Sequence, residues 1–332
     1  MKFLILGGPK FLGRHLIEAA LSHHHQVTLF NRGQTNSELF PAVEKLRGNR
    51  DGDLLALQGR QWDVVIDTCG FVSAKVRATA RLLAGAVGQY VFVSSISVYH
   101  DFTKPGLDES TPVGQLPAGA IEDEQNSDTY GARKALCEEA AEATMPGRVL
   151  IVRAGLMVGP HDGSGRFLYW VRRAAQGGEI LAPGDPEAPV QLIDARDLAR
   201  WIILMAEAGN AGVYNATGPA AGLTFRQMLE HCNTAVGSQP RMTWVDDQFL
   251  LENGVTPFSE LPFWLPLPTH RGFFAMDCRR AFASGLVCRG LIQTAYDTLA
   301  WDRAATSQGS IGLKLDREKE LLRVWNRKCT HS

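Results

Sequence analysis

Short apolar runs alternate with longer amphipathic stretches through the first half of the chain. The short runs predict buried strands over residues 2–6, 26–30, 63–67, 90–94 and 149–153. Between them, apolar positions recur three and four residues apart, which predicts helices over residues 11–22, 74–86 and 130–143. Continuous apolar strands that alternate with helices are typical of a parallel sheet covered on both faces. The pattern therefore predicts an α/β fold with a doubly wound parallel sheet.

The alternation becomes less regular after residue 153. Residues 191–193 and 194–207 predict one more strand and helix of the sheet, with Asp194 and Asp197 capping and starting that helix. Residues 212–215 predict a further strand. We therefore predict a sheet domain of residues 1–153 plus about 189–217, and a smaller, interleaved C-terminal domain of about 154–188 plus 218–332.

Composition excludes several classes of protein. The 332 residues include 34 Lys and Arg against 35 Asp and Glu, and this balance disfavours a protein that grips nucleic acid or an anionic membrane. No apolar run is long enough to predict a membrane span. The six cysteines show no CxxC spacing, so neither a zinc site nor a disulfide framework is predicted, and a cytoplasmic location is expected. The histidine run at residues 23–25 is interpreted as a solvated turn, and no metal site is predicted.

A glycine-rich loop follows the first predicted strand and opens the first helix. Its glycines let the backbone approach a pyrophosphate, and the helix N-terminus offers free N–H groups. This context is typical of a Rossmann-type dinucleotide-binding domain, with the smaller domain binding substrate. The loop residues expected at the cofactor are Gly7, Gly8, Lys10, Phe11, Leu12 and Gly13.

Two cations favour NADP(H) over NAD(H), although NAD(H) stays an alternative. Lys10 occupies the position where a GxxGxxG loop has its middle glycine. The second strand ends in Asn31 and Arg32, where an NAD enzyme usually has an acidic residue for the ribose 2′-hydroxyl. A carboxylate would repel a 2′-phosphate, whereas Arg32 can pair with it.

Three polar side chains point to proton transfer. Tyr130 and Lys134 lie four residues apart, on one face of a predicted helix. A nearby ammonium would lower the pKa of a tyrosine and let it exchange a proton near neutral pH. Ser95, at the end of a predicted strand, can hydrogen-bond a substrate oxygen.

These motifs resemble the extended short-chain dehydrogenase/reductase family, in its NAD-dependent epimerase/dehydratase-like branch. The glycine loop with Asn31 and Arg32 is closer to its atypical, reductase-like members. The other matching segments are residues 67–70, 94–99, 130–134, 153–160 and 193–199. The resemblance implies that Ser95, Tyr130 and Lys134 are catalytic, with Tyr130 as general acid/base and Lys134 also binding the nicotinamide ribose. It further implies cofactor contacts from Asn49, Asp67, Thr68, Cys69, Ser94 and Ala154.

Two departures from the family pattern reduce the number of reactions expected of this chain. Sugar-nucleotide dehydratases carry an Asp-Glu pair after the catalytic hydroxyl, where this chain has Ile96 and Ser97. Epimerases usually carry an Asn at the position of Leu156, where it contacts the substrate diphosphate. We therefore expect hydride transfer to a carbonyl or conjugated double bond of a small, fairly apolar molecule.

Two other functions stay open at this stage: a sugar or nucleotide-sugar epimerase that uses NAD, and a non-catalytic RNA-binding relative like the plant stem-loop binding proteins of this family. The balanced charge and the intact Ser95, Tyr130 and Lys134 disfavour the RNA-binding function. The expected partners are a small-molecule substrate and, as a homodimer, a second copy of the chain. A group of aromatic residues is interpreted either as a pocket lining or as core: Phe167, Tyr169, Trp170, Phe263 and Trp264.

Overall fold

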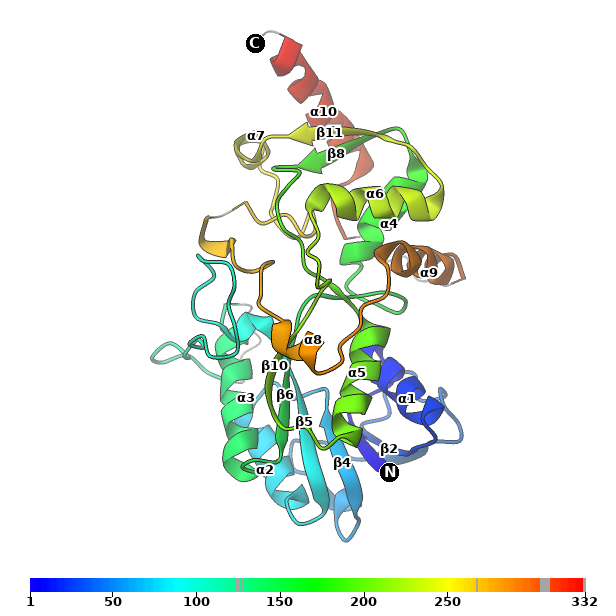
Figure 1. The fold of residues 1–332 in the computed structure, drawn as a ribbon, viewed down its shortest axis with the longest axis vertical. Helices are drawn as coiled ribbons and strands as arrows, with labels where there is room; N and C mark the ends of the chain where they lie inside the picture. Colours follow the sequence, from blue (N-terminus) through cyan, green and yellow to red (C-terminus); the bar gives the residue numbers. More distant parts are fainter. Residues whose placement is uncertain (123–125, 127, 267, 305–310, 331–332) are drawn as a thin grey trace.

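The computed structural model describes residues 1–122, 126, 128–266, 268–304 and 311–330. Its centre is a seven-stranded parallel sheet of order β10-β6-β5-β4-β1-β2-β3, drawn in the lower half of Figure 1. The strands are β1 (Lys2–Leu6), β2 (Gln26–Asn31), β3 (Glu44–Arg47), β4 (Trp62–Asp67), β5 (Val87–Ser95), β6 (Val149–Ala154) and β10 (Gly212–Ala216). The predicted Rossmann-type α/β fold is confirmed.

Helices cover both faces of the sheet. On one face α1 (Phe11–Ser22) packs against α5 (Ala195–Glu207), and on the other α2 (Ser73–Leu83) packs against α3 (Tyr130–Thr144). Each face has its own apolar core, because successive strand residues point to opposite sides. Phe3 and Ile5 belong to the core under α1 and α5, and Leu4 and Leu6 to the core under α2 and α3.

Two strand predictions differ from the structure. The edge strand β3 was not predicted, because only Leu46 of its four residues is buried. The strand predicted at residues 191–193 does not join the large sheet. Instead β9 (Ile193–Asp194) pairs with β7 (Met157–Val158) in a separate two-stranded sheet.

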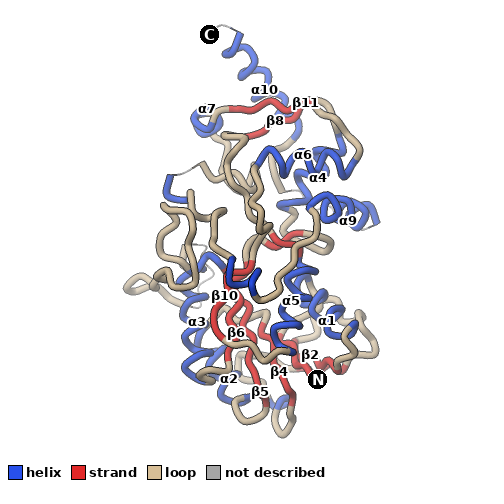
Figure 2. Tube along the Cα trace, viewed as in Figure 1, coloured by secondary structure: helices blue, strands red, loops and turns tan. Residues whose placement is uncertain are grey.

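The upper part of the molecule consists mainly of helices and loops, as the tube in Figure 2 shows. It contains one further two-stranded sheet, of β8 (Glu179–Pro183) and β11 (Arg241–Val245). Its helices are α4 (Arg166–Gln176), α6 (Phe225–Val236), α7 (Asp247–Glu252), α9 (Leu291–Ala304) and α10 (Leu315–Thr330). These elements share an apolar core that includes the predicted aromatic residues Phe167, Trp170, Phe263 and Trp264. The assignment of residues to two domains stays a prediction.

The remaining elements are short. They are α8 (Arg279–Ala283) and the 3₁₀ turns η1 (Leu55–Leu57), η2 (Ile96–Val98) and η3 (Pro268–His270). In the described part of the chain, no helix combines the length and the apolar character that a membrane span requires.

The strand order reverses at β1, which has β2 on one side and β4 on the other. In open α/β sheets, ligands bind outside the carboxyl ends of the strands at this reversal. The loops after β1 and β4 therefore mark the expected binding site.

Candidate active site

The glycine loop is packed so tightly that side chains would not fit at two of its positions. Gly7 has a φ of +128°, and a Cβ there would lie 2.3 Å from Thr68 Oγ1, in the loop after β4. A Cβ at Gly13 would lie 2.3 Å from the carbonyl oxygen of Gly8. These two glycines therefore bring α1 and the loop after β4 against the end of β1.

The same loop leaves room for a ligand. A Cβ at Gly8 would meet nothing within 4 Å, and no side chain caps the N-terminus of α1. Lys10 is exposed at the cap position, with Phe11 and Leu12 in the first turn. An uncapped helix N-terminus beside open glycine backbone fits a pyrophosphate, since its N–H groups and dipole favour an anion.

Two arginines and one asparagine lie where β2 and β3 end. The Asn31 amide nitrogen donates to the carbonyl oxygen of Gly7 over 3.1 Å, and its Oδ1 accepts from the Arg47 guanidinium over 2.7 Å. Arg32 is exposed beside them. Sequence analysis missed Arg47, because β3 had not been predicted and its pairing with β2 was therefore unknown. The ends of β2 and β3 thus carry Arg32 and Arg47, and the charge of Arg32 helps to lower the pKa of Asp51 after β3.

The loop after β4 is held by a buried ion pair. Asp67 is fully buried and accepts from Arg50 over 2.7 Å and from the Tyr90 hydroxyl over 2.7 Å. Because its carboxylate is engaged in the protein interior, contact between Asp67 and a cofactor would have to come from backbone atoms. Thr68 donates to the Leu6 carbonyl over 2.9 Å, and burial raises the pKa of the Cys69 thiol to about 11. Arg50 was not singled out in the sequence.

The other predicted cofactor residues lie around this edge in different environments. Asn49 forms a turn after β3, with its side-chain oxygen accepting from the Asp51 N–H over 3.2 Å. Ala154 is buried at the end of β6. The Ser94 hydroxyl donates its proton to Glu138 over 2.5 Å, so it could only accept a hydrogen bond from a ligand. Their cofactor contacts stay predictions.

The structure brings Ser95 and Tyr130 together. Ser95 lies close enough to influence the pKa of Tyr130. Ser95 Oγ donates to Ser97 Oγ over 3.1 Å and accepts from the Ser97 N–H over 3.1 Å. Burial raises the pKa of Tyr130 above its ordinary value, while the hydrogen bond with Ser95 and the charges of Arg133 and Arg166 oppose that rise. This direction is opposite to the lowered pKa that the sequence suggested. Tyr130 is therefore a protonated hydroxyl at neutral pH, which suits a proton donor.

Lys134 lies one turn further along α3 and is completely enclosed. Its Nζ donates to the carbonyl oxygens of Gly70 and Val93 over 2.8 and 2.7 Å, and lies 4.1 Å from the centre of the Phe92 ring. Burial lowers the pKa of Lys134 to about 8, although the charge of Asp67 opposes this. The amine is thus fixed between the loop after β4 and strand β5, at the carboxyl edge of the sheet.

A cavity of about 590 Å³ lies in the upper part of the molecule. Its lining includes Phe225, Phe263, Trp264, Phe274 and Arg271. Phe263 and Trp264 thus belong to the core and also border a cavity, while Phe167 and Trp170 are core alone.

Comparisons with known proteins agree with this geometry. The sequence profile of the NAD dependent epimerase/dehydratase family matches residues 3–217, more than half of the chain. A 2-alkyl-3-oxoalkanoate reductase of Stenotrophomonas maltophilia (strain K279a) is 27% identical over 263 residues, covering 73% of this chain and 77% of the relative. The chloroplast stem-loop binding protein of 41 kDa b of Arabidopsis thaliana is 31% identical over 119 residues, 30% of each chain.

The fold is also found in solved structures. The UDP-glucuronic acid 4-epimerase of Bacillus cereus, in complex with NAD, superposes with a TM-score of 0.66 at 14% identity. The superposition covers 92% of this chain and 99% of the epimerase. Together with the profile match, this fold shows that the chain belongs to the NAD dependent epimerase/dehydratase family of extended short-chain dehydrogenases/reductases.

Proposed function

We propose that this protein is an NADPH-dependent reductase that transfers a hydride to a carbonyl group of a small organic acid, with Ser95, Tyr130 and Lys134 as catalytic residues. The observation that carries the proposal is that Ser95 lies close enough to lower the pKa of Tyr130, with Lys134 one turn along the same helix. Reduction needs a proton donor at the carbonyl oxygen, and the protonated hydroxyl of Tyr130 can supply that proton.

The residues around the glycine loop fit a dinucleotide. Gly8 and the uncapped N-terminus of α1 would hold the pyrophosphate, and Arg32 with Arg47 would hold a 2′-phosphate. The bound nicotinamide would supply the hydride. Preference for NADPH rests on the two arginines and on the absence of a carboxylate at Asn31 and Arg32.

The chain's own residues would handle the carbonyl oxygen. Ser95 Oγ and the Tyr130 hydroxyl would both donate to this oxygen and orient the substrate. As the carbon gains the hydride, the oxygen gains negative charge and takes the proton of Tyr130, leaving an alcohol and a phenolate. The Lys134 ammonium would stabilise that phenolate until solvent returns the proton.

Arg166 suggests that the substrate carries a carboxylate. It lies in the first turn of α4 with its guanidinium 5.2 Å from the Phe258 ring centre, and its charge acts on Tyr130. Its charge also opposes the rise that burial gives the pKa of Asp162, but no ion pair joins Arg166 to a carboxylate in the described ranges of the chain. A 3-oxo acid, the class named for the S. maltophilia relative, has a carboxylate two carbons from the reacting carbonyl. We therefore infer a 3-oxo acid substrate.

The test is net turnover of cofactor by the purified protein. With NADPH and a series of 2-alkyl-3-oxoalkanoates, we expect one NADPH oxidised for each hydroxy acid formed. Arg166→Ala should raise KM for these acids about 10- to 100-fold, the value of a hydrogen-bonded charge contact, with less effect on an uncharged ketone. Interconversion of UDP-sugars without net change in cofactor would instead support an epimerase.

The preference for NADPH over NADH is tested in a separate experiment. Arg32→Ala should weaken NADPH binding about 10- to 100-fold while leaving NADH binding nearly unchanged. The control is Arg323→Ala, which removes an exposed arginine from α10. Equal weakening of both cofactors by Arg32→Ala would contradict the 2′-phosphate assignment.

A further inference from the structure

Two histidines and a glutamate, distant in sequence, converge at the edge of the sheet opposite the candidate active site. His23 lies at the end of α1, His25 just before β2, and Glu207 is the last residue of α5. Glu207 Oε1 is 2.9 Å from His23 Nδ1 and 2.6 Å from His25 Nε2. Figure 1 shows α1 and α5 side by side, so the cluster joins the ends of two packed helices.

We propose that His23, His25 and Glu207 bind a divalent cation of the zinc class. One ligand atom from each residue lies within 4.8 Å of the others. Zinc bonds of about 2.0–2.2 Å place neighbouring ligand atoms about 3.3 Å apart, so each side chain needs to move by less than about 1 Å. Two imidazoles and one carboxylate suit zinc, whereas calcium and magnesium prefer oxygen ligands.

The surroundings hold the ligands in place before a cation arrives. His25 packs its ring 4.9 Å from that of Phe3, and only 10% of its side chain is exposed. The other ring nitrogen of His25, Nδ1, lies 3.2 Å from the amino group of Met1. A cation at Nε2 would place the ring proton on Nδ1, so this amino group would have to move or lose a proton.

A bound cation needs His23 Nδ1 and His25 Nε2 free of protons, so each ring would carry its proton on the other nitrogen. Three protein ligands would leave a fourth position for water. The site is remote from the carboxyl edge of the sheet, so its role would be to tie the turn between α1 and β2 to the end of α5.

Neighbouring His24 provides a matched control. It is exposed, has a φ of +60°, and is not part of the cluster. His24→Asn removes an imidazole from the same run and keeps a residue that tolerates this backbone conformation. If the three residues of the cluster bind the cation, Glu207→Gln weakens binding and His24→Asn does not. If the run of histidines alone binds it, His24→Asn weakens binding and Glu207→Gln does not.

The experiment is calorimetric titration of the chelator-treated full-length protein with Zn²⁺, and spectroscopy with Co²⁺. We expect one Zn²⁺ per chain, with affinity at least about tenfold lower in Glu207→Gln and His25→Ala and unchanged in His24→Asn. Co²⁺ should give visible bands without an intense thiolate band. Saturating Zn²⁺ should raise the melting temperature of the wild type and not that of Glu207→Gln.

Three results would overturn the proposal: no stoichiometric binding, equal binding by Glu207→Gln, or a thiolate band showing that cysteine holds the ion. Because Glu207→Gln keeps the size of the side chain, circular dichroism of this variant separates loss of the site from loss of the fold.

Discussion

At the scale of single residues, Tyr130 is the group on which the proposed reaction depends most. Tyr130→Phe removes the hydroxyl whose pKa Ser95 influences and keeps the ring. Turnover should fall about 10²- to 10⁴-fold, the usual contribution of a positioned general acid, while cofactor affinity changes little. Steady-state kinetics and cofactor titration measure the two effects. The control is Tyr296→Phe, since Tyr296 is 60% exposed on α9; retained turnover in Tyr130→Phe would remove Tyr130 from its role.

The buried amine of Lys134 predicts a dependence of stability on pH. Its pKa falls from 10.5 to about 8 on folding, because burial disfavours the ammonium. Between these two values the unfolded chain holds more protons than the folded one, so raising the pH through this window stabilises the fold; below about 8 the full penalty is present. Urea unfolding across the window should show a smaller increase for Lys134→Met than for the wild type. An identical increase in both proteins would contradict the lowered pKa.

The candidate site residues predicted from the sequence are those that belong to a short local motif. The glycine loop and the spacing of Tyr130 and Lys134 are read within a few positions of the chain, and Ser95 follows from the end of one strand. Arg47 and Arg50 could not be found in this way, because their contacts with Asn31 and Asp67 depend on the order of strands in the sheet. The direction of the Tyr130 pKa shift also depends on burial by distant residues.

At the scale of elements, the placement of Tyr130 depends on how closely α3 approaches the turn η2. A Cβ at Gly131 would lie 1.9 Å from the carbonyl oxygen of Ser97, a backbone atom, so a larger residue must push the helix away. Gly131→Ala should therefore separate Tyr130 from Ser95 and lower kcat/KM about 10²-fold, the expected cost of a shift near 1 Å.

Gly85→Ala is the control for that substitution, since a Cβ at Gly85 meets nothing within 4 Å. The decisive readout is that kcat falls for Gly131→Ala while circular dichroism keeps its wild-type shape. Wild-type kinetics in Gly131→Ala would mean that the close approach does not position Tyr130. Sequence pattern predicted both α3 and its starting residue, but gave no indication that Gly131 is required, because the contact is with a segment more than thirty residues earlier.

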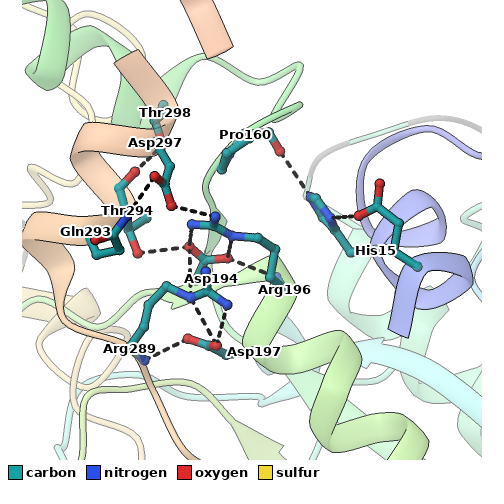
Figure 3. A network of polar contacts seen from close by, with 11 residues as sticks. His15, Pro160, Asp194, Arg196, Asp197, Arg289, Gln293, Thr294, Asp297 and Thr298 are labelled. Carbon is teal, nitrogen blue, oxygen red and sulfur yellow. Dashed lines mark hydrogen bonds and ion pairs between the residues drawn. The ribbon is translucent and has the colours of Figure 1, made fainter. Parts of the chain in front are cut away.

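At the scale of the whole molecule, a polar network connects the sheet to the upper part, as Figure 3 shows. Asp194 caps α5 as predicted, accepting from the Arg196 N–H over 2.9 Å, and it also accepts from Thr294 of α9 over 2.8 Å. Asp197 accepts from the Arg289 backbone N–H over 2.7 Å and from its guanidinium over 2.8 Å. Sequence pattern identified the cap, which is local; the partners from α9 and Arg289 lie about a hundred residues away.

Loss of Arg289 should weaken the connection between these two parts. Asp197 is almost fully buried, whereas 29% of the Arg289 side chain is exposed. Arg289→Ala would leave the buried carboxylate of Asp197 with the backbone N–H of residue 289 as its remaining donor. The free energy of unfolding should fall by about 2–3 kcal/mol, less than for a fully buried ion pair. Urea unfolding at neutral pH measures this loss, and Arg200→Ala, an exposed position on the same helix as Asp197, should change stability by less than about 0.5 kcal/mol.

The stability that Arg289→Ala removes should depend on pH. Burial alone would raise the pKa of Asp194, but its hydrogen bond and ion pair with Arg196 and the charge of Arg289 lower it below the ordinary value. A carboxyl group with a lowered pKa stabilises the fold fully above its unfolded value, and this contribution is lost as the pH falls through the folded value. The difference in unfolding free energy between the wild type and Arg289→Ala should therefore be constant near neutral pH and shrink in acid below about pH 4. A difference that stays constant into acid would show that Arg289 acts through packing and not through the charge of Asp194.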